Sequence, residues 1–140
     1  MSQECLRHAQ VTHGIIGAFY DVYNDLGPGF LESVYERAMK IALEERGLRV
    51  NRQCPIEVRY RGYPVGHFRA DLVVEATVLV ELKASDRIHP RHVAQVINAL
   101  KATRFEVGLL LNFGPKAERK RIILTNDQKT RSGQIRADPC

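Results

Sequence analysis

The chain has 140 residues, of which 44% are hydrophobic and 26% charged, and it carries a formal net charge of +5. This length and composition are typical of one globular domain with a single hydrophobic core. There is no apolar run of about 18 residues, which argues against a transmembrane helix, and residues 1–5 lack the basic start and apolar stretch of a signal peptide. We therefore expect a cytoplasmic protein with no membrane partner, and its basic charge favours a polyanionic partner. The cysteines form no CxxC pair, so a zinc ribbon or an iron–sulfur cluster has no support.

Two helices are predicted in the first third of the chain. Apolar residues recur at helical spacing from Leu6 to Leu26. The segment Gly27-Pro28-Gly29 ends this helix, because proline lacks an amide hydrogen and the glycines admit left-handed turns. A second helix is predicted from Phe30 to Arg46, and Gly47 follows it at the position of a C-terminal cap.

After Gly47 the apolar pattern changes to a period of two, which is typical of strands. Strands are predicted over residues 56–60, 66–75, 77–84, 106–113 and 121–125, and a helix from Pro90 to Thr103 separates the third from the fourth. The third and fourth strands are apolar on both faces, so we expect them near the sheet centre. Residues 1–125 are thus predicted to form a single domain, a mixed sheet with helices against it. The polar residues 126–140 are expected to be a disordered tail.

Two carboxylates on neighbouring predicted strands carry the first indication of chemistry. If the connection around Ala76 has three residues, Asp71 lies directly opposite Glu81, whereas a two-residue turn would put them on opposite faces. Facing carboxylates have Cβ atoms about 4.5–5.5 Å apart and destabilise a sheet, and a hard divalent cation such as Mg²⁺ would compensate for this. Lys83 shares a face with Glu81 and is placed to hold a nucleophilic water or a phosphate oxygen. The alternative is a set of plain ion pairs among these residues and Arg69.

Further polar candidates lie on the predicted helices. Glu32 borders the buried stripe of the second helix, although a first-turn acid is also favoured by the helix dipole alone. Glu36 and Glu44 are predicted to face solvent. Gln95 lies in the middle of the third helix, where hydrogen bonding at the helix edge is the alternative to a catalytic role.

Several of these residues match a known family pattern. The segment Gly29-Phe-Leu-Glu-Ser-Val-Tyr35 reproduces the signature of the GxxExxY proteins, and Asp71 with Glu81-Leu-Lys83 resembles the core of the PD-(D/E)XK nuclease superfamily. The resemblance spans roughly residues 8–125 and includes His92-Val-Ala-Gln95. It implies an α/β, restriction-endonuclease-like fold with a mixed central β-sheet flanked by helices. It also implies hydrolysis of phosphodiester bonds in nucleic acid, dependent on Mg²⁺ or Mn²⁺.

The resemblance also implies a role for each residue at the metal. By analogy, Asp71 and Glu81 bind the metal, and the backbone carbonyl of Leu82 is a further ligand. Lys83 orients or activates the attacking water. Glu32 corresponds to the helix glutamate of the lambda-exonuclease-like branch, and it completes the metal shell or contacts it through water.

On the substrate side, Gln95 corresponds to the glutamine of the QxxxY motif of that branch, and Ala99 stands where the tyrosine is expected. The implied partner is DNA, and the small surface of one domain favours a homodimer. The sequence pattern contains no obvious arm, wedge or recognition helix. Two alternatives stay open: a nucleic-acid- or partner-binding module that kept the fold without turnover, and a structural or regulatory protein whose charges form plain ion pairs.

Overall fold

The computed structural model describes residues 3–129. Two helices come first, α1 (Gln3–Leu26) and α2 (Glu32–Glu45). The remaining elements are β1 (Val50–Tyr60), β2 (Tyr63–Val74), β3 (Val78–Lys83), α3 (Pro90–Lys101), β4 (Val107–Phe113), β5 (Ala117–Ile123) and a 3₁₀ turn, η1 (Asn126–Gln128). Within the described range, no helix is long and apolar enough to cross a membrane.

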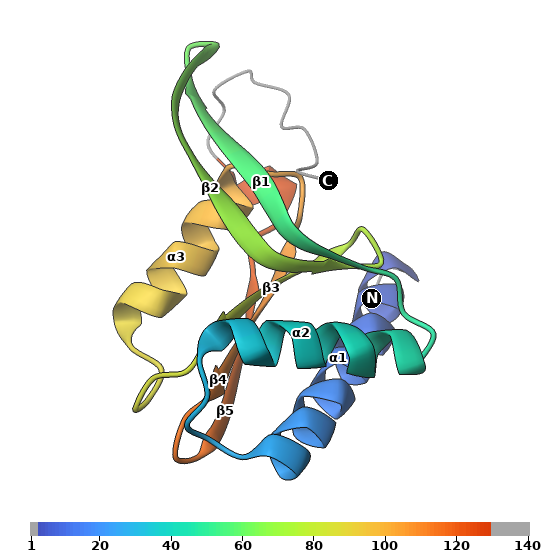
Figure 1. Ribbon diagram of the computed structural model, residues 1–140. Coiled ribbons are helices and arrows are strands. Elements are labelled where there is room, and N and C mark those ends of the chain that lie inside the picture. Colours follow the sequence, from blue (N-terminus) through green and yellow to red (C-terminus); the bar gives the residue numbers. More distant parts are fainter. Residues whose placement is uncertain (1–2, 130–140) are drawn as a thin grey trace.

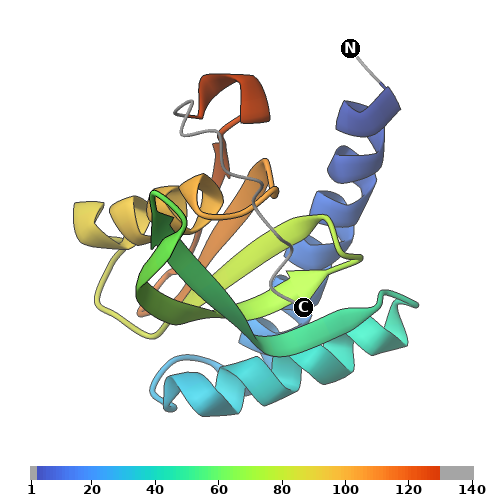
Figure 2. The ribbon, with the colours of Figure 1, turned by 90° about the horizontal axis from the view of Figure 1, so that it is seen from above.

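The strands form one five-stranded sheet in the order β1-β2-β3-β4-β5. Pairing between β3 and β4 is parallel because α3 carries the chain back across the sheet, and the other pairs are antiparallel. Helices α1 and α2 cover one face and α3 covers the other (Figures 1 and 2). The fold is therefore the α/β arrangement expected from the sequence, with β3 and β4 in its interior.

Each face of the sheet has its own hydrophobic core. On the α1/α2 face the core includes Phe19, Tyr35, Leu82 and Phe113, all of them buried. On the α3 face it includes the residues Ala70, Val73, Leu79, Val96, Ala99 and Leu110. Alternation along β3 sends Val80 and Leu82 into the first core and Leu79 into the second, as expected for a strand covered on both faces.

Helix α2 has well-defined ends. It begins at Glu32, two residues later than predicted, because Gly27 (φ 66°) and Gly29 (φ 111°) keep the preceding loop out of the helical region. At the other end Gly47 has φ 76°, and the amides of Gly47 and Leu48 donate to the carbonyls of Glu44 and Leu43. This is a Schellman cap, so the predicted cap at Gly47 is confirmed.

The two edge strands are longer at their N-terminal ends than the sequence pattern predicts. Strand β1 starts at Val50 rather than Ile56, although it contains Pro55. Proline is tolerated there because β1 is an edge strand, so the ladder loses no essential donor. Strand β5 starts at Ala117 rather than Arg121, and its first residues are polar because the other edge faces solvent.

The β2–β3 hairpin has the register on which the candidate site depends. Leu72 pairs with Val80, Val73 with Leu79, and Val74 with Val78. Residues 75–77 form a three-residue connection, in which Glu75 (φ 53°) and Ala76 (φ 52°) are left-handed. The odd connection and the predicted pair Val73–Leu79 are therefore confirmed, and the ladder ends at Leu72–Val80, one residue short of Asp71 and Glu81.

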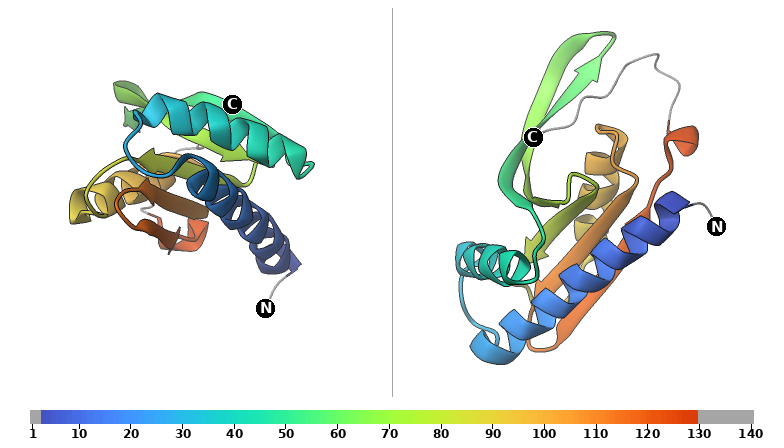
Figure 3. Two further views of the ribbon diagram at one scale, coloured as in Figure 1. Left: turned by 60° about the horizontal axis from the view of Figure 1, so that its bottom comes forward. Right: turned by 90° about the vertical axis from the view of Figure 1, so that its right-hand side faces the viewer.

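The β1–β2 hairpin projects well beyond the rest of the molecule, at the top of Figure 1 and in the right-hand view of Figure 3. The sequence pattern showed no obvious arm, and this projection is visible only in the structure. Alternation of apolar residues could not predict it, because a hairpin exposed on both faces has no buried face to produce that alternation.

Part of the segment expected to be a disordered tail has a defined place in the fold. Residues 126–128 form η1, and the Lys129 ammonium donates to the carbonyls of Thr103 and Phe105, each at 2.8 Å. The rest of that segment, residues 130–140, lies outside the described residues.

Candidate active site

Four of the predicted site residues lie together at the C-terminal end of β3, close to the N-terminal end of α2. Figure 1 shows this region at the lower left, where β3 ends beside the cyan start of α2. Asp71 comes from β2, Glu81 and Lys83 from β3, and Glu32 from the first turn of α2. Each of the four acts electrostatically on at least one of the others. The structure therefore brings these predicted residues into one neighbourhood.

Asp71 and Glu81 form a carboxyl pair at the centre. The Leu82 amide donates to Asp71 Oδ2 at 2.8 Å, which fixes the Asp71 side chain against β3. Glu81 is only 2% exposed. Burial first, and then the Asp71 charge and a hydrogen bond to it, raise the pKa of Glu81 to about 9. Burial also raises the pKa of Asp71, against the opposing effect of the Leu82 amide. Both shifts favour one shared proton on the pair at neutral pH.

One oxygen of this pair lacks a partner. Glu81 Oε1 is buried, and no hydrogen-bond donor among residues 3–129 reaches it. A buried polar atom without a partner costs roughly 1–3 kcal/mol, so such atoms often mark a site for water or an ion. Mg²⁺ and Mn²⁺ prefer oxygen ligands. This pair of adjacent carboxylates, with one unpaired oxygen, suits such an ion.

Lys83 is the positive charge of the site. Its ammonium lowers the pKa of Glu32, Asp71 and Glu81, in each case against a larger effect of burial. The chain beyond Lys83 is fixed by the fully buried Asn112, whose amide group exchanges hydrogen bonds of 2.9 and 3.0 Å with the backbone of Ser85. The end of β3 is therefore rigidly held, as a positioned lysine requires.

Glu32 lies on the rim of the site, where it is exposed. Partial burial is the main cause that raises its pKa, and the charge of Asp71 adds to it. The position of Glu32 is set by Tyr35, which is fully buried and stacks on Phe113 with ring centroids 4.1 Å apart. The Tyr35 hydroxyl donates to the Gly27 carbonyl at 2.6 Å and accepts from the Phe30 amide at 3.1 Å. The tyrosine thus holds the loop from which α2 starts.

Glu36 is a residue that the sequence analysis placed wrongly. It is 8% exposed rather than facing solvent, and it accepts hydrogen bonds from Arg52 at 3.2 Å and from Gln53 at 3.0 and 3.1 Å. Its charge also raises the pKa of Asp71. The signal was available, because Glu36 follows Glu32 by one helical turn and so shares its face. The solvent-facing prediction is confirmed for Glu44, which makes an exposed ion pair with Lys40.

These contacts predict different effects for the two glutamates of α2. Glu36→Ala should lower the free energy of unfolding by about 1–3 kcal/mol, because the half-buried donors of Arg52 and Gln53 lose their buried acceptor. Glu44→Ala is the matched control on the same helix, and it should change stability by less than about 0.5 kcal/mol. Urea denaturation of both variants measures the difference. Equal losses would show that the Glu36 contacts add nothing to the fold.

Gln95 lies away from the carboxyl pair. It lines a hollow of about 310 Å³ together with Phe68 of β2 and Arg91, Ala94 and Asn98 of α3. Ala99 is fully buried in the core between α3 and the sheet, so the position where a tyrosine was expected faces the interior here. The structure therefore places Gln95 in a groove between α3 and the β1–β2 hairpin.

Two histidines at the start of α3 were not singled out from the sequence. His92 is 7% exposed, and its Nδ1 accepts the His89 amide at 3.1 Å. Burial, and then the charges of Lys83 and Arg91, lower the pKa of His92. The His89 ring contacts Asp86 at 2.7 Å, and this hydrogen bond is the main cause that lowers the pKa of Asp86 to about 2. The available signal was Pro90, which marks the helix start that these side chains cap.

The structure does not bring a complete metal shell together. Among residues 3–129, no three His, Cys, Asp or Glu side chains lie close enough to hold a metal ion. Asp71 and Glu81 are in contact, whereas Glu32 lies at the rim. The side chain of Glu32 would have to turn inward, or act through water, to take part.

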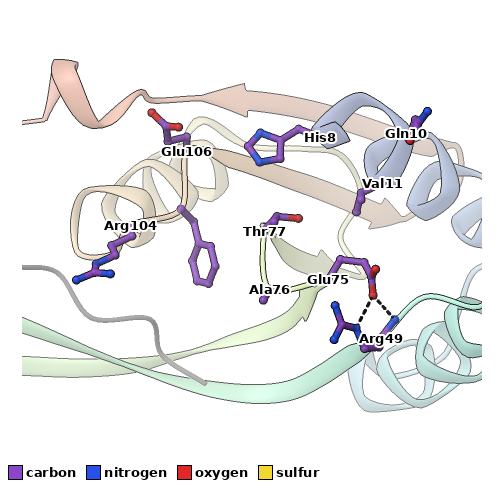
Figure 4. A pocket seen from close by; sticks show the side chains of 10 residues that line it. His8, Gln10, Val11, Arg49, Glu75, Ala76, Thr77, Arg104 and Glu106 are labelled. Atoms are coloured by element: carbon purple, nitrogen blue, oxygen red, sulfur yellow. Dashed lines mark hydrogen bonds and ion pairs between the residues drawn. The ribbon is translucent and has the colours of Figure 1, made fainter. Parts of the chain in front are cut away.

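A larger hollow of about 560 Å³ lies at the opposite end of β3, around the β2–β3 turn (Figure 4). Its lining combines the acids Glu75 and Glu106 with the bases Arg49 and Arg104. Arg49 is paired with Glu75 at 3.1 Å, and Glu106 accepts the Asn126 amide at 2.7 Å. Both acids already accept hydrogen bonds, and neither has a buried oxygen without a partner such as the one on Glu81 at the other end.

Comparison with known proteins agrees with this geometry. Residues 9–122 match the PD-(D/E)XK nuclease superfamily, and the chain belongs to that superfamily. No curated protein matches the chain. Among solved structures, the crystal structure of SSO0001 is similar to 69% of this chain, with 16% sequence identity and a TM-score of 0.44. The similar part spans 51% of that protein's chain, about half its length.

Proposed function

We propose that the protein is a divalent-metal-dependent nuclease that hydrolyses phosphodiester bonds in DNA. The observation that carries the proposal is the unpaired, buried Glu81 oxygen beside Asp71, with Lys83 on the same strand. Membership of a nuclease superfamily supports it. The spacing of the GxxExxY signature supports our assignment to that family and to the lambda-exonuclease-like branch.

In this proposal Asp71, Glu81 and the Leu82 carbonyl would hold Mg²⁺ or Mn²⁺, with Glu32 completing the shell directly or through water. The bound cation would supply positive charge to the phosphate oxygens. A bound cation would neutralise both carboxylates and so offset the effects of burial and of the Asp71 charge, which oppose ionisation of Glu81. Glu81 would then ionise and release the proton that the pair shares.

The protein's own contribution to the reaction comes mainly from Lys83. Its ammonium would donate hydrogen bonds to the attacking water or to a phosphate oxygen, and its charge would oppose the negative charge that develops there. Asn112 keeps the end of β3 in place through Ser85. Gln95 would contact the substrate from the groove beside α3.

The test of the proposed function is cleavage of DNA by the purified protein with Mg²⁺, with Mn²⁺ and with a chelator. The wild type should cut only with metal, and Asp71→Asn should lower the rate by about 10²–10³-fold, because it removes one carboxylate of the site. RNA as a parallel substrate separates the two nucleic acids. An Asp71→Asn variant as active as the wild type would exclude this site from the reaction.

We also propose a cytoplasmic location and a homodimer. The dimer is proposed because one small domain offers little surface for a duplex. Light scattering of the purified protein at micromolar concentration measures the oligomeric state directly.

A further inference from the structure

The projecting end of the β1–β2 hairpin, residues 59–67, is called the arm below. All of its residues are exposed, yet its strands stay paired up to Tyr60 and Tyr63 at the tip. Figure 1 and the right-hand view of Figure 3 show it standing clear of the helices. A two-stranded ribbon without a core of its own is only marginally stable in water. Its exposed side chains add nothing to the core of the domain, so their role has to be sought outside folding.

The side chains of the arm combine aromatic and basic groups. Tyr60, Tyr63 and Val65 are 59%, 73% and 62% exposed. Residues 58–70 contain three arginines and one histidine and no acidic residue, although Glu57, just before this segment, pairs with Arg59. Exposed tyrosines beside arginines are typical of surfaces that bind nucleic acid, where rings contact bases and cations contact phosphates.

At the tip of the arm, the turn holds Arg61 in a strained backbone conformation that asparagine would adopt more easily. Arg61 (φ 49°) and Gly62 (φ 82°) are both left-handed, as in a type I′ turn, for which Asn-Gly is the favoured pair. A left-handed arginine costs roughly 1–2 kcal/mol. The Arg61 guanidinium lies over the Tyr60 ring, 5.1 Å from its centroid. An arginine in place of asparagine therefore points to a use for its side chain.

We propose that the arm enters the groove of duplex DNA and holds it across the candidate active site. The proposal rests on the proposed function in taking DNA as the ligand. The major groove of DNA admits a two-stranded β-ribbon, and the basic residues lie on both strands of the hairpin, so they face the phosphates on both sides of a groove. Strand β2 runs without a break from Tyr63 to Asp71, which corresponds to at most ~26 Å. The arm would thus reach about 8 base pairs from the site, at ~3.4 Å per base pair.

Equilibrium binding without cleavage tests the arm. Fluorescence anisotropy with a labelled duplex of about 20 base pairs, in chelator, should give a Kd about 3–10-fold higher for Arg61→Asn, with the salt dependence reduced by about one counterion. This variant suits the type I′ turn better than the wild type, so it should not unfold the arm. A double variant, Tyr60→Ser with Tyr63→Ser, should raise the Kd by about tenfold. Arg121→Asn on β5 makes the same charge change at the other edge of the sheet and serves as the control.

The outcomes separate the arm from the nuclease proposal. If the wild type binds duplex and the arm variants bind more weakly, the arm is supported even when no variant cuts. Arm variants that bind like Arg121→Asn would overturn the proposal while leaving the nuclease intact. A stronger effect on single-stranded than on duplex DNA would overturn the groove geometry. A changed oligomeric state with unchanged DNA binding would make the arm a contact between copies of the chain, which also overturns it.

Discussion

Replacing Lys83 by alanine is expected to lower the rate of DNA cleavage by about 10²–10³-fold, the size of effect seen when one group that stabilises developing charge is removed. The reason is geometric and electrostatic. Lys83 is the cation that lowers the pKa of all three site carboxyls, so in the proposed reaction its ammonium would lie near the phosphate. Since it lies at the end of β3, its removal should leave the fold in place.

Single-turnover cleavage with excess enzyme measures this effect, and isothermal calorimetry with Mg²⁺ and Mn²⁺ should show that the variant still binds metal. Lys120→Ala on the edge strand β5 is the matched control, since it removes the same charge from an exposed position that strand β4 separates from β3. If Lys83→Ala and the wild type bind DNA equally and neither cuts it, the protein is a binding module on a nuclease fold rather than a nuclease.

The part of the site that depends on local patterns could be predicted from the sequence. Strand alternation and a three-residue connection were enough to place Asp71 next to Glu81, because the side-chain period of a strand is two and one turn sets its register. The cap at Gly47 and the interior position of β3 and β4 followed from equally local rules.

The features that depend on tertiary contacts were not predictable in this way. Glu36 is buried because Arg52 and Gln53 of β1 reach across to it, and the segment that carries them was not recognised as a strand. Pro55 and the polar residues before it conceal that strand, which lies on an edge where proline is tolerated. The arm was missed for a similar reason, since exposure on both faces leaves no apolar period.

Both unpredicted features, the contacts that bury Glu36 and the arm, involve strand β1. Near its start β1 supplies Arg52 and Gln53, which hold Glu36 beside the site, and at its end it supplies Tyr60 of the arm. The strand thus links the acidic centre to the basic ribbon. In the proposed function, negative charge concentrates where the cation would bind and positive charge where the phosphate backbone would lie.

A second large effect is expected for Glu81→Gln, on stability and on metal binding. In the folded protein the pKa of Glu81 is raised from 4.5 to about 9, so between these values the folded state holds a proton that the unfolded state releases. The contribution of this group to stability is therefore fully present below pH 4.5 and is lost as pH rises through about 9. Without metal, the free energy of unfolding of the wild type should fall with pH across this window, by at most ~1.4 kcal/mol per pH unit.

The amide introduced by Glu81→Gln does not ionise, so the variant should lose this slope. In chelator at pH 8 it should be more stable than the wild type by roughly 1–3 kcal/mol, because Glu81 must take up a proton when the wild type folds at this pH, whereas the amide is neutral in both states. Metal should stabilise the wild type and leave the stability of the variant unchanged. It displaces the proton from Glu81 in the wild type, so Mg²⁺ affinity should rise with pH up to about 9, whereas the variant should gain no thermal stability from metal.

Calorimetric melting of both proteins between about pH 5 and pH 9, in chelator and in Mg²⁺, measures all of these effects. Glu44→Gln on the exposed side of α2 controls for the loss of one carboxylate and should leave the wild-type pH slope unchanged. The opposite pattern, in which Glu81→Gln destabilises the protein at every pH and metal stabilises neither protein, is what plain ion pairs would produce. That result would make Asp71, Glu81 and Lys83 a structural cluster. In a metal site, by contrast, the wild type without metal should be less stable than the variant with a neutral amide at position 81.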